Sequence, residues 1–218
     1  MTIFYKILFT LVLLGFVRIV SAQELTEDEV KKANNPLADA IAVNLQNYYV
    51  PTIYDNADIH SNTFLFRFIL PLAKGKILTR FTMPINTVPT SYGNGTAKYA
   101  SGTGDLNFFA TYTFTKPTSK LLIGAGPQVS IPTANSDYTG TGKWQLGGAF
   151  ILFNSASPIV QYGTLITAQS SIAGQEDRSS TTQLQVQPFF MVQLGKGTYL
   201  RSTGLASFNL YSHMYNVP

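Results

Sequence analysis

The stretch Thr182–Leu194, TQLQVQPFFMVQL, decides the fold class. Its residues alternate between apolar and polar types, which is the two-residue period of a β-strand with chemically different faces. A soluble β-sandwich would collect lysine and glutamate on its polar face, whereas uncharged amides are typical of a wet barrel lumen. The stretch therefore predicts a barrel strand in which Leu184, Val186, Phe190 and Val192 face lipid and Gln183, Gln185, Gln187 and Gln193 face the lumen.

The same alternation recurs along most of the chain. Together with 182–194 it predicts nine strands, at 40–53, 62–72, 76–86, 104–115, 119–131, 143–153, 158–169, 182–194 and 198–209. The connections after even-numbered strands are short, and those after odd-numbered strands (54–61, 87–103, 132–142 and 170–181) are long and polar. Outer-membrane barrels alternate short periplasmic turns with long outer loops. We therefore expect an all-β antiparallel transmembrane β-barrel of outer-membrane type, entered from the periplasmic side.

Composition excludes several other classes of protein. Only 12% of the 218 residues are charged, whereas 45% are hydrophobic and 13% aromatic; a soluble domain carries about 25% charged residues. The chain has no cysteine and therefore no disulfide framework or thiolate chemistry. Its net charge of +4 is too small and too scattered to indicate a nucleic-acid partner. No cofactor is expected.

The N-terminal part differs from the repeating segments. Residues 1–22 have a positive start, a short apolar core and small residues before the cleavage point, which is the pattern of a secretory signal peptide. An anchor helix is the alternative, although spanning a bilayer takes about 20 apolar residues. Residues 23–38 follow as a periplasmic lead-in, in which Thr26 and Glu29 form a capping box that predicts a short helix. The barrel is expected over 39–218, in the outer membrane of a Gram-negative bacterium.

The strand count leads to an expectation about the chain's end. Nine is odd, and bacterial single-chain barrels close with an even number of strands. We therefore expect a C-terminally truncated barrel, a fragment that lacks about three strands of about twelve, with 211–215 as an outer loop. Two alternatives stay open: the N-terminal region closes on the ninth strand, or several chains assemble around a shared pore.

Prolines within the predicted strands conflict with a closed barrel, which has no free edge to accommodate a missing backbone donor. We predict that Pro71 and Pro84 end their strands and that Pro127 and Pro188 lie in β-bulges. Frequent glycines within strands are expected of a tightly curved sheet.

Few charged side chains fall on the polar faces, and these are the candidate functional residues. Arginines in a constriction bind carboxylates and bias a pore toward anions. The favoured alternative is structural, with Arg67 or Arg80 paired to Asp105, because small barrels fill their lumens with side chains. The lumen and selectivity candidates are Arg67, Arg80, Asp105, Gln128, Gln185, Gln187 and Arg201.

Catalysis is not expected. His60-Ser61-Asn62 holds the residue types of an outer-membrane lipid hydrolase but lacks the residue that those enzymes place between His and Ser. Nothing in the sequence requires a base to reach its nucleophile there with a third group orienting it. His60 and His213 have no second ligand at metal-binding spacing, so no metal site is expected.

Several short motifs resemble a known family. They are NPLAD at 35–39, PINTVPT at 84–90, GTGDL at 102–106, GAGPQ at 124–128 and GTGKWQ at 140–145. Together they resemble the outer-membrane protein and transporter family named after the meta-pathway of phenol degradation. The resemblance implies a barrel of about a dozen strands that takes up aromatic or other apolar compounds.

The expected function is therefore a porin-like channel or transporter for small molecules. The first alternative is a non-conducting barrel whose outer loops, above all 87–103, bind a partner or surface. A lipid hydrolase is a remote alternative. The expected partners are outer-membrane lipid, the barrel-assembly and periplasmic chaperone machinery, and small-molecule solutes; the oligomeric state is left open.

Overall fold

The computed structural model describes residues 41–53, 59–93, 96–116, 119–195, 198–212 and 214–216. The predicted signal peptide at 1–22 and helical lead-in at 23–38 lie outside these residues. The described chain is all-β and forms one antiparallel twelve-stranded sheet. No helix in the described ranges is long and apolar enough to cross a membrane. The strands are β1 (Ala42–Val50), β2 (Ser61–Leu72), β3 (Ile77–Gly93), β4 (Thr96–Thr103), β5 (Leu106–Thr113), β6 (Leu121–Ile131), β7 (Lys143–Asn154), β8 (Val160–Gly174), β9 (Thr182–Gly195), β10 (Thr198–Thr203), β11 (Ala206–Asn209) and β12 (Met214–Asn216).

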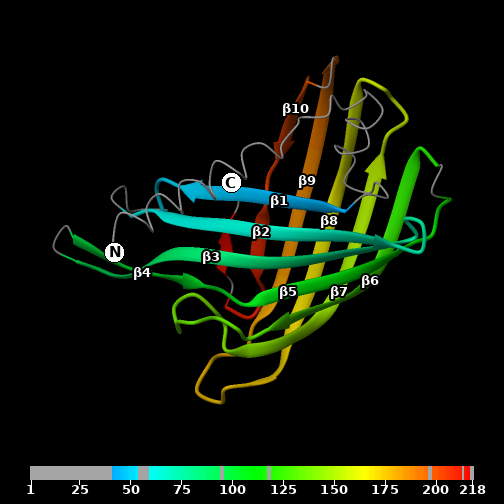
Figure 1. Cartoon of the computed structure of the whole chain (residues 1–218). Helices are drawn as coiled ribbons and strands as arrows, with labels where there is room; N and C mark the ends of the chain where they lie inside the picture. Colours follow the sequence, from blue (N-terminus) through cyan, green and yellow to red (C-terminus); the bar gives the residue numbers. More distant parts are fainter. Residues whose placement is uncertain are drawn as a thin grey trace, which may run out of the picture.

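The sheet is a meander that curls into a half-barrel (Figure 1). Its order is β1-β2-β3-β5-β6-β7-β8-β9-β11-β12, so neighbours in the sheet are neighbours along the chain, except where β4 folds back on β3 and β10 lies on β9. The curl brings the first strands opposite the late ones. Gln187 Nε2 on β9 accordingly donates a hydrogen bond to the Tyr48 hydroxyl on β1 at 3.2 Å. Among the described strands, β1 and β12 each have one paired neighbour.

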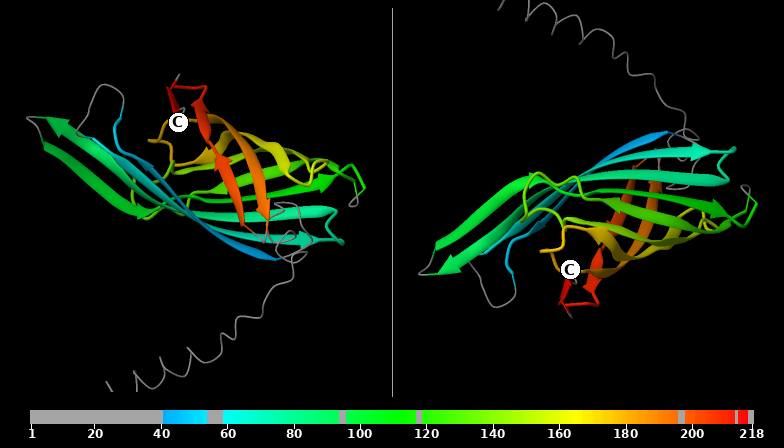
Figure 2. Two further views of the ribbon diagram at one scale, coloured as in Figure 1. Left: turned by 90° about the horizontal axis from the view of Figure 1, so that it is seen from above. Right: turned by 90° about the horizontal axis from the view of Figure 1, so that it is seen from below.

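Eight of the nine predicted strands correspond to single strands of the sheet, and the ninth is interrupted. Residues 198–209 divide into β10 and β11, which pair with β9 on either side of a break at 204–205. The predicted long connection 87–103 is not an irregular loop, because β3 continues to Gly93 and β4 returns along it as a hairpin. This hairpin projects beyond the rest of the sheet (Figure 2). The last two residues of the predicted outer loop 211–215 lie in β12, which runs from Met214 to Asn216.

Three of the four prolines contradict the sequence-based assignment. Pro71 is next to the end of β2, as predicted, but Pro84 lies inside β3, opposite Leu65. Pro127 and Pro188 are not in bulges, because the pairing register of β6 with β7 and of β8 with β9 continues unchanged through them. On the opposite edge of each of these strands, the pairing is interrupted at the proline. Pro84 lies between the part of β3 that pairs with β5 and the part that pairs with β4. Pro127 lies in a gap of the pairing between β5 and β6, and Pro188 lies between the part of β9 that pairs with β10 and the part that pairs with β11. Proline has no backbone N–H to donate to a neighbouring strand, so it is tolerated where the neighbouring strand is not paired.

The two faces of the sheet differ in the predicted way. On β9 the even-numbered residues from Leu184 face outward, and the odd-numbered residues from Gln183 face the concave interior. The convex face exposes large apolar side chains on many strands, among them Leu45, Phe66, Phe81, Tyr112, Leu146, Phe150, Tyr162, Phe190 and Leu200.

Inward-facing glycines permit the curvature. A Cβ built on Gly147 would lie 1.8 Å from the Ala168 carbonyl oxygen, and one on Gly126 would lie 1.9 Å from that of Ala110. A larger residue at either position would push neighbouring strands apart. Only glycine therefore fits at these two positions of the curled sheet.

The concave interior has two zones, which the sequence analysis did not anticipate. The zone near the short connections is apolar and holds two buried clusters. These are Leu78, Phe109, Ala149, Ile151 and Leu165, and Leu122, Phe153, Phe189 and Met191. The zone near the long connections is polar and contains the candidate site. The polar inner face that the sequence predicts is therefore interrupted by two apolar clusters near the short connections.

Candidate functional site

The polar zone encloses a cavity of about 530 Å³, which we call the main cavity. Its walls come from β1, β2, β3, β5, β6, β7, β8 and β9, from the 203–207 region, and from the connection 138–141. The lining includes four apolar residues, Val50, Leu65, Pro84 and Leu205. Most of the other lining residues carry an amide or a hydroxyl group, among them Tyr48, Thr63, Thr82, Asn86, Asn107, Ser130, Gln145, Gln169, Gln183, Gln185 and Thr203. The volume lies within the range of small-molecule binding sites.

A buried amide network holds one wall of the main cavity. The Gln169 side-chain oxygen accepts hydrogen bonds from Gln128 Nε2 at 2.7 Å, from the Ser130 hydroxyl at 3.0 Å and from Asn107 Nδ2 at 3.4 Å. Its own Nε2 donates to Gln145 Oε1 at 3.0 Å. Four strands are thereby joined through one glutamine, so this wall is preorganised.

Arg67 and Arg80 project from the neighbouring strands β2 and β3. The register pairs Ile69 with Arg80, so the two arginines are diagonal neighbours on the concave face. Arg67 is 6% exposed and donates to Gln46 Oε1 on β1. The Arg80 guanidinium lies 4.5 Å from the centre of the Phe109 ring. The Nε groups of both arginines are buried and have no hydrogen-bond partner among the described residues.

The arginines lie at the boundary between the two interior zones. Both line the main cavity and also a smaller cavity of about 60 Å³ that is bounded by the apolar cluster. Arg201 on β10 and Gln187 on β9 line the smaller cavity as well. The structure thus brings three of the predicted arginines to one region. Gln185 lines the main cavity, and Gln187 donates to Tyr48 and to Thr203 Oγ1.

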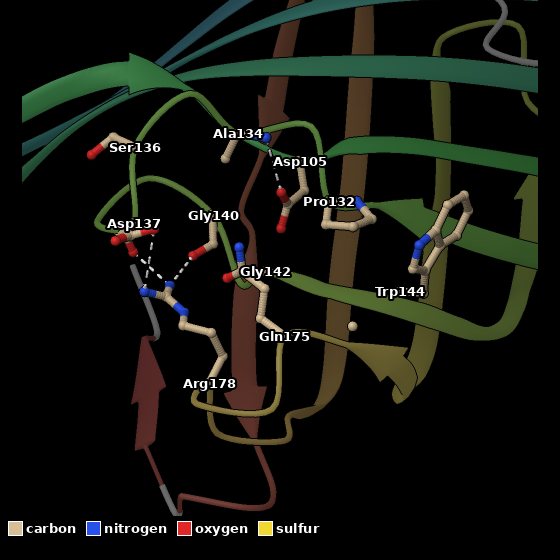
Figure 3. A pocket seen from close by; sticks show the side chains of 11 residues that line it. Asp105, Pro132, Ala134, Ser136, Asp137, Gly140, Gly142, Trp144, Gln175 and Arg178 are labelled. Carbon is tan, nitrogen blue, oxygen red and sulfur yellow. Dashed lines mark hydrogen bonds and ion pairs between the residues drawn. The ribbon is translucent and has the colours of Figure 1, made fainter.

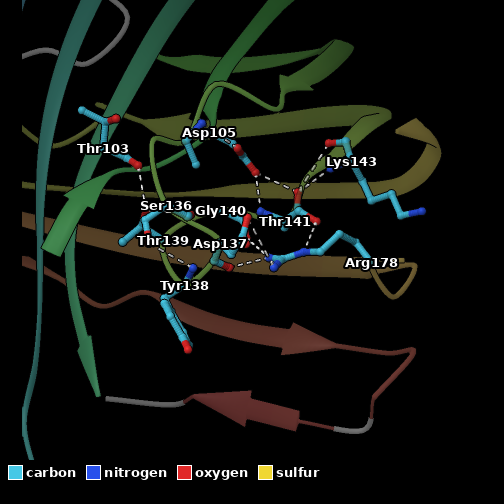
Figure 4. A network of polar contacts seen from close by, with 11 residues as sticks. Thr103, Asp105, Ser136, Asp137, Tyr138, Thr139, Gly140, Thr141, Lys143 and Arg178 are labelled. Carbon is cyan, nitrogen blue, oxygen red and sulfur yellow. Dashed lines mark hydrogen bonds and ion pairs between the residues drawn. The ribbon is translucent and has the colours of Figure 1, made fainter. Parts of the chain in front are cut away.

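Asp105 does not pair with an arginine, which corrects the favoured structural interpretation. One carboxylate oxygen accepts from the Ala134 amide at 3.2 Å. The other accepts from the Thr141 amide and the Thr141 hydroxyl, both at 2.7 Å. Both oxygens thus bind the connection 132–142 (Figure 4), and Arg67 and Arg80 form no ion pair with Asp105.

The connection 132–142, which we call the inner loop, is fixed at several points and forms part of the cavity wall. Thr139 is buried, its hydroxyl donates to the Thr103 carbonyl at 2.8 Å, and its own carbonyl accepts from Asn86 Nδ2 at 3.0 Å. Arg178, from the next long connection, donates to the carbonyls of Asp137 at 2.5 Å and Gly140 at 2.6 Å. A surface pocket of about 450 Å³ lies between these two connections (Figure 3).

The residues considered for catalysis and metal binding have structural neighbours. The His60 ring stacks on Tyr99 of β4 with centroids 4.4 Å apart, and the Tyr99 hydroxyl lies 3.0 Å from His60 Nδ1. Ser61 begins β2 and pairs with Val50. Within the described ranges no three His, Cys, Asp or Glu side chains cluster as metal ligands. His213 lies outside the described residues.

Sequence reasoning missed several site residues. Gln145 and Gln169 follow the period-two alternation of their strands, so the sequence is sufficient to predict that both side chains face inward. It is not sufficient to predict that they form hydrogen bonds in one network. The inward direction of the inner loop and its contact with Arg178 could not be predicted. A polar connection between strands has the same composition whether it folds away from the sheet or into its concave side.

Comparison of the chain with family models, with curated proteins and with solved structures finds no match. The family resemblance carried by the short motifs therefore stays a prediction.

Proposed function

We propose that this chain is an outer-membrane β-barrel protein that forms a narrow channel for small molecules. The observation that carries the proposal is the opposition of the two sheet faces. The convex face exposes large apolar side chains across β1, β2, β3, β5, β7, β8, β9 and β10. Monomeric soluble proteins rarely expose many large apolar side chains on one face, and the position of these side chains on the outside of the curved sheet fits lipid.

The concave face supports the channel part of the proposal. It holds the main cavity, whose amide and hydroxyl lining can replace the hydration of a polar solute. The apolar clusters at the other end fit a hydrophobic gate, since apolar constrictions close pores by excluding water. Solute would reach the cavity from the end that carries the long connections. Membrane residence implies lipid contact and delivery by the export and barrel-assembly machinery.

Reconstitution tests this proposal. Purified full chain in planar lipid bilayers should give discrete conductance steps, and liposomes that contain it should swell in permeant solutes. Gln185→Trp should narrow the main cavity and lower the conductance. Leu184→Trp, the same substitution on the convex face, should leave it unchanged. A silent protein in both assays, or equal effects of the two variants, would overturn the channel proposal.

The second candidate function is a non-conducting barrel whose long connections bind a partner. The observations that favour it are the filled apolar zone, with Phe153 fully buried and Met191 1% exposed, and the projecting β3–β4 hairpin. Deletion of 91–100, at the tip of this hairpin, separates the two functions. Loss of cell-surface attachment by a chain that never conducts would favour the binding role, whereas conductance retained by the deletion variant would favour the channel.

A further inference from the structure

We propose that Arg67 and Arg80 bind the carboxylate of a small hydroxylated organic acid held in the main cavity. The inference rests on the proposed function only in that solute must reach the lumen. It names the class of solute that the lumen would retain.

The first step is the charge at the boundary between the polar and the apolar zone of the interior. Two guanidinium groups lie on diagonal positions of β2 and β3, and Arg67 is 6% exposed. Their Nε groups have no partner among the described residues, and Asp105 is already engaged by the inner loop. A buried charge is costly unless it is paired and hydrogen-bonded. Since both arginines also line the main cavity, the pair presents a positive charge there that no described carboxylate neutralises.

The second step is the geometry of these donors. Arginine offers a planar fork that matches a carboxylate in two parallel hydrogen bonds, and it keeps its charge when it is buried. Gln46 holds Arg67, and the Phe109 ring supports the Arg80 guanidinium. Both side chains are thus held in place before a ligand arrives, which reduces the entropy lost on binding.

The third step concerns the body of the ligand. On the side of the long connections, the arginines face the main cavity of about 530 Å³. Its amide and hydroxyl groups can form hydrogen bonds with several hydroxyl groups of a ligand. On the side of the short connections, the arginines face the smaller cavity of about 60 Å³, which is bounded by Ile69, Leu78 and Phe109. This cavity leaves no room for an aromatic ring or an alkyl chain. A bound acid must therefore extend into the polar cavity. This lining favours a hydroxylated acid over the apolar compounds that the family resemblance implies.

Calorimetry on the purified full chain in detergent, at low salt, tests the assignment. The probes are gluconate, glucose, benzoate and inorganic phosphate. Gluconate should bind, whereas glucose, which lacks the carboxylate, and benzoate, which lacks the hydroxyl groups, should bind at least about tenfold more weakly. Glucose or benzoate binding as tightly as gluconate would overturn the proposal. Phosphate binding as tightly would overturn the assignment to a hydroxylated acid.

Variants locate the site. Arg67→Gln and Arg80→Gln should each weaken gluconate binding by about tenfold or more, because each removes a charged donor. Lys74→Gln, in the short turn of the same hairpin, removes the same charge at an exposed position and should leave binding unchanged. An equal loss in all three variants, or none in the arginine variants, would overturn the proposal. If the arginine variants fail to fold, the probe series on the unaltered chain still decides.

The failure of this inference can be told from failure of the channel proposal. Conductance without selective gluconate binding would leave the channel standing and overturn the site. Selective gluconate binding by a chain that never conducts would support the site and overturn the channel.

Discussion

Replacing Asp105 by asparagine should release the inner loop. The Asp105 carboxylate accepts three hydrogen bonds, from the Ala134 amide and from the amide and hydroxyl of Thr141. Asparagine keeps the shape but has one acceptor oxygen, so an NH₂ group must face a backbone N–H on one side. At least one charge-assisted bond is lost and the others weaken, a cost of about 2 kcal/mol. The open population of the loop should therefore rise roughly 30-fold.

Hydrogen exchange followed by mass spectrometry measures this change. The peptide that covers 132–142 should exchange faster by a similar factor in Asp105→Asn, and strands β7 to β9 should keep their protection. Asp137→Asn is the matched control, because the Asp137 side chain is 81% exposed and lies 4.0 Å from Arg178. An exposed pair at this distance contributes little. Unchanged exchange in Asp105→Asn, or equal acceleration in both variants, would refute the role given to Asp105.

Three further substitutions test the sheet. Gly147→Ala should lower the stability of the folded sheet by about 3 kcal/mol, since its Cβ would collide with a carbonyl oxygen 1.8 Å away. Gly148→Ala, whose Cβ would lie 3.5 Å from the nearest atom, should be tolerated. Urea midpoints in detergent compare the two variants, and equal midpoints would contradict the role given to Gly147. Gln169→Leu should lower the free energy of unfolding by about 3 kcal/mol, because the donors of Gln128, Ser130 and Asn107 lose their buried acceptor. A urea midpoint equal to that of the unaltered chain would show that the network does not contribute to stability. Phe66→Arg, on the convex face, should lower the stability of the protein in a bilayer by about 2–4 kcal/mol. Tyr138→Arg, at an exposed side chain of the inner loop, should cost nothing measurable. Equal refolding yields of the two variants into liposomes would count against lipid contact.

The strand positions and their faces could be predicted because each depends on local alternation. On β5, Leu106, Phe108 and Tyr112 face away from Asn107 and Thr111, as the period requires. Phe109 faces inward against the polar pattern, because it packs with Leu78 from β3 and Ile151 from β7. Such packing joins residues far apart along the chain and leaves no local trace.

The β3–β4 hairpin was missed although the sequence holds a signal for it. The dipeptide Asn94-Gly95 between threonine- and tyrosine-containing segments is typical of a two-residue β-hairpin turn. The alternation of long and short connections does not distinguish a hairpin from an irregular loop, because either can form a long connection. The positions of Pro84, Pro127 and Pro188 could not be predicted in this way, because they depend on where the neighbouring ladders stop.

The partner of Asp105 could not be predicted because its choice depends on the direction of the inner loop. From sequence, the only cations near Asp105 on polar strand faces are Arg67 and Arg80. The backbone amides of Ala134 and Thr141 compete for the same carboxylate only once the loop folds inward. Backbone donors in connections are present in every sequence and carry no residue-specific signal.

Cysteine labelling in membranes tests most directly whether the convex face lies in lipid and the concave face in water. The chain has no cysteine, so each substitution creates the sole thiol. In outer-membrane vesicles, a membrane-impermeant maleimide should label Gln183→Cys and Gln185→Cys and spare Leu184→Cys and Val186→Cys, and a lipophilic maleimide should give the reverse. Labelling of all four positions by the impermeant reagent would show that both faces of β9 meet water, and would contradict the membrane barrel.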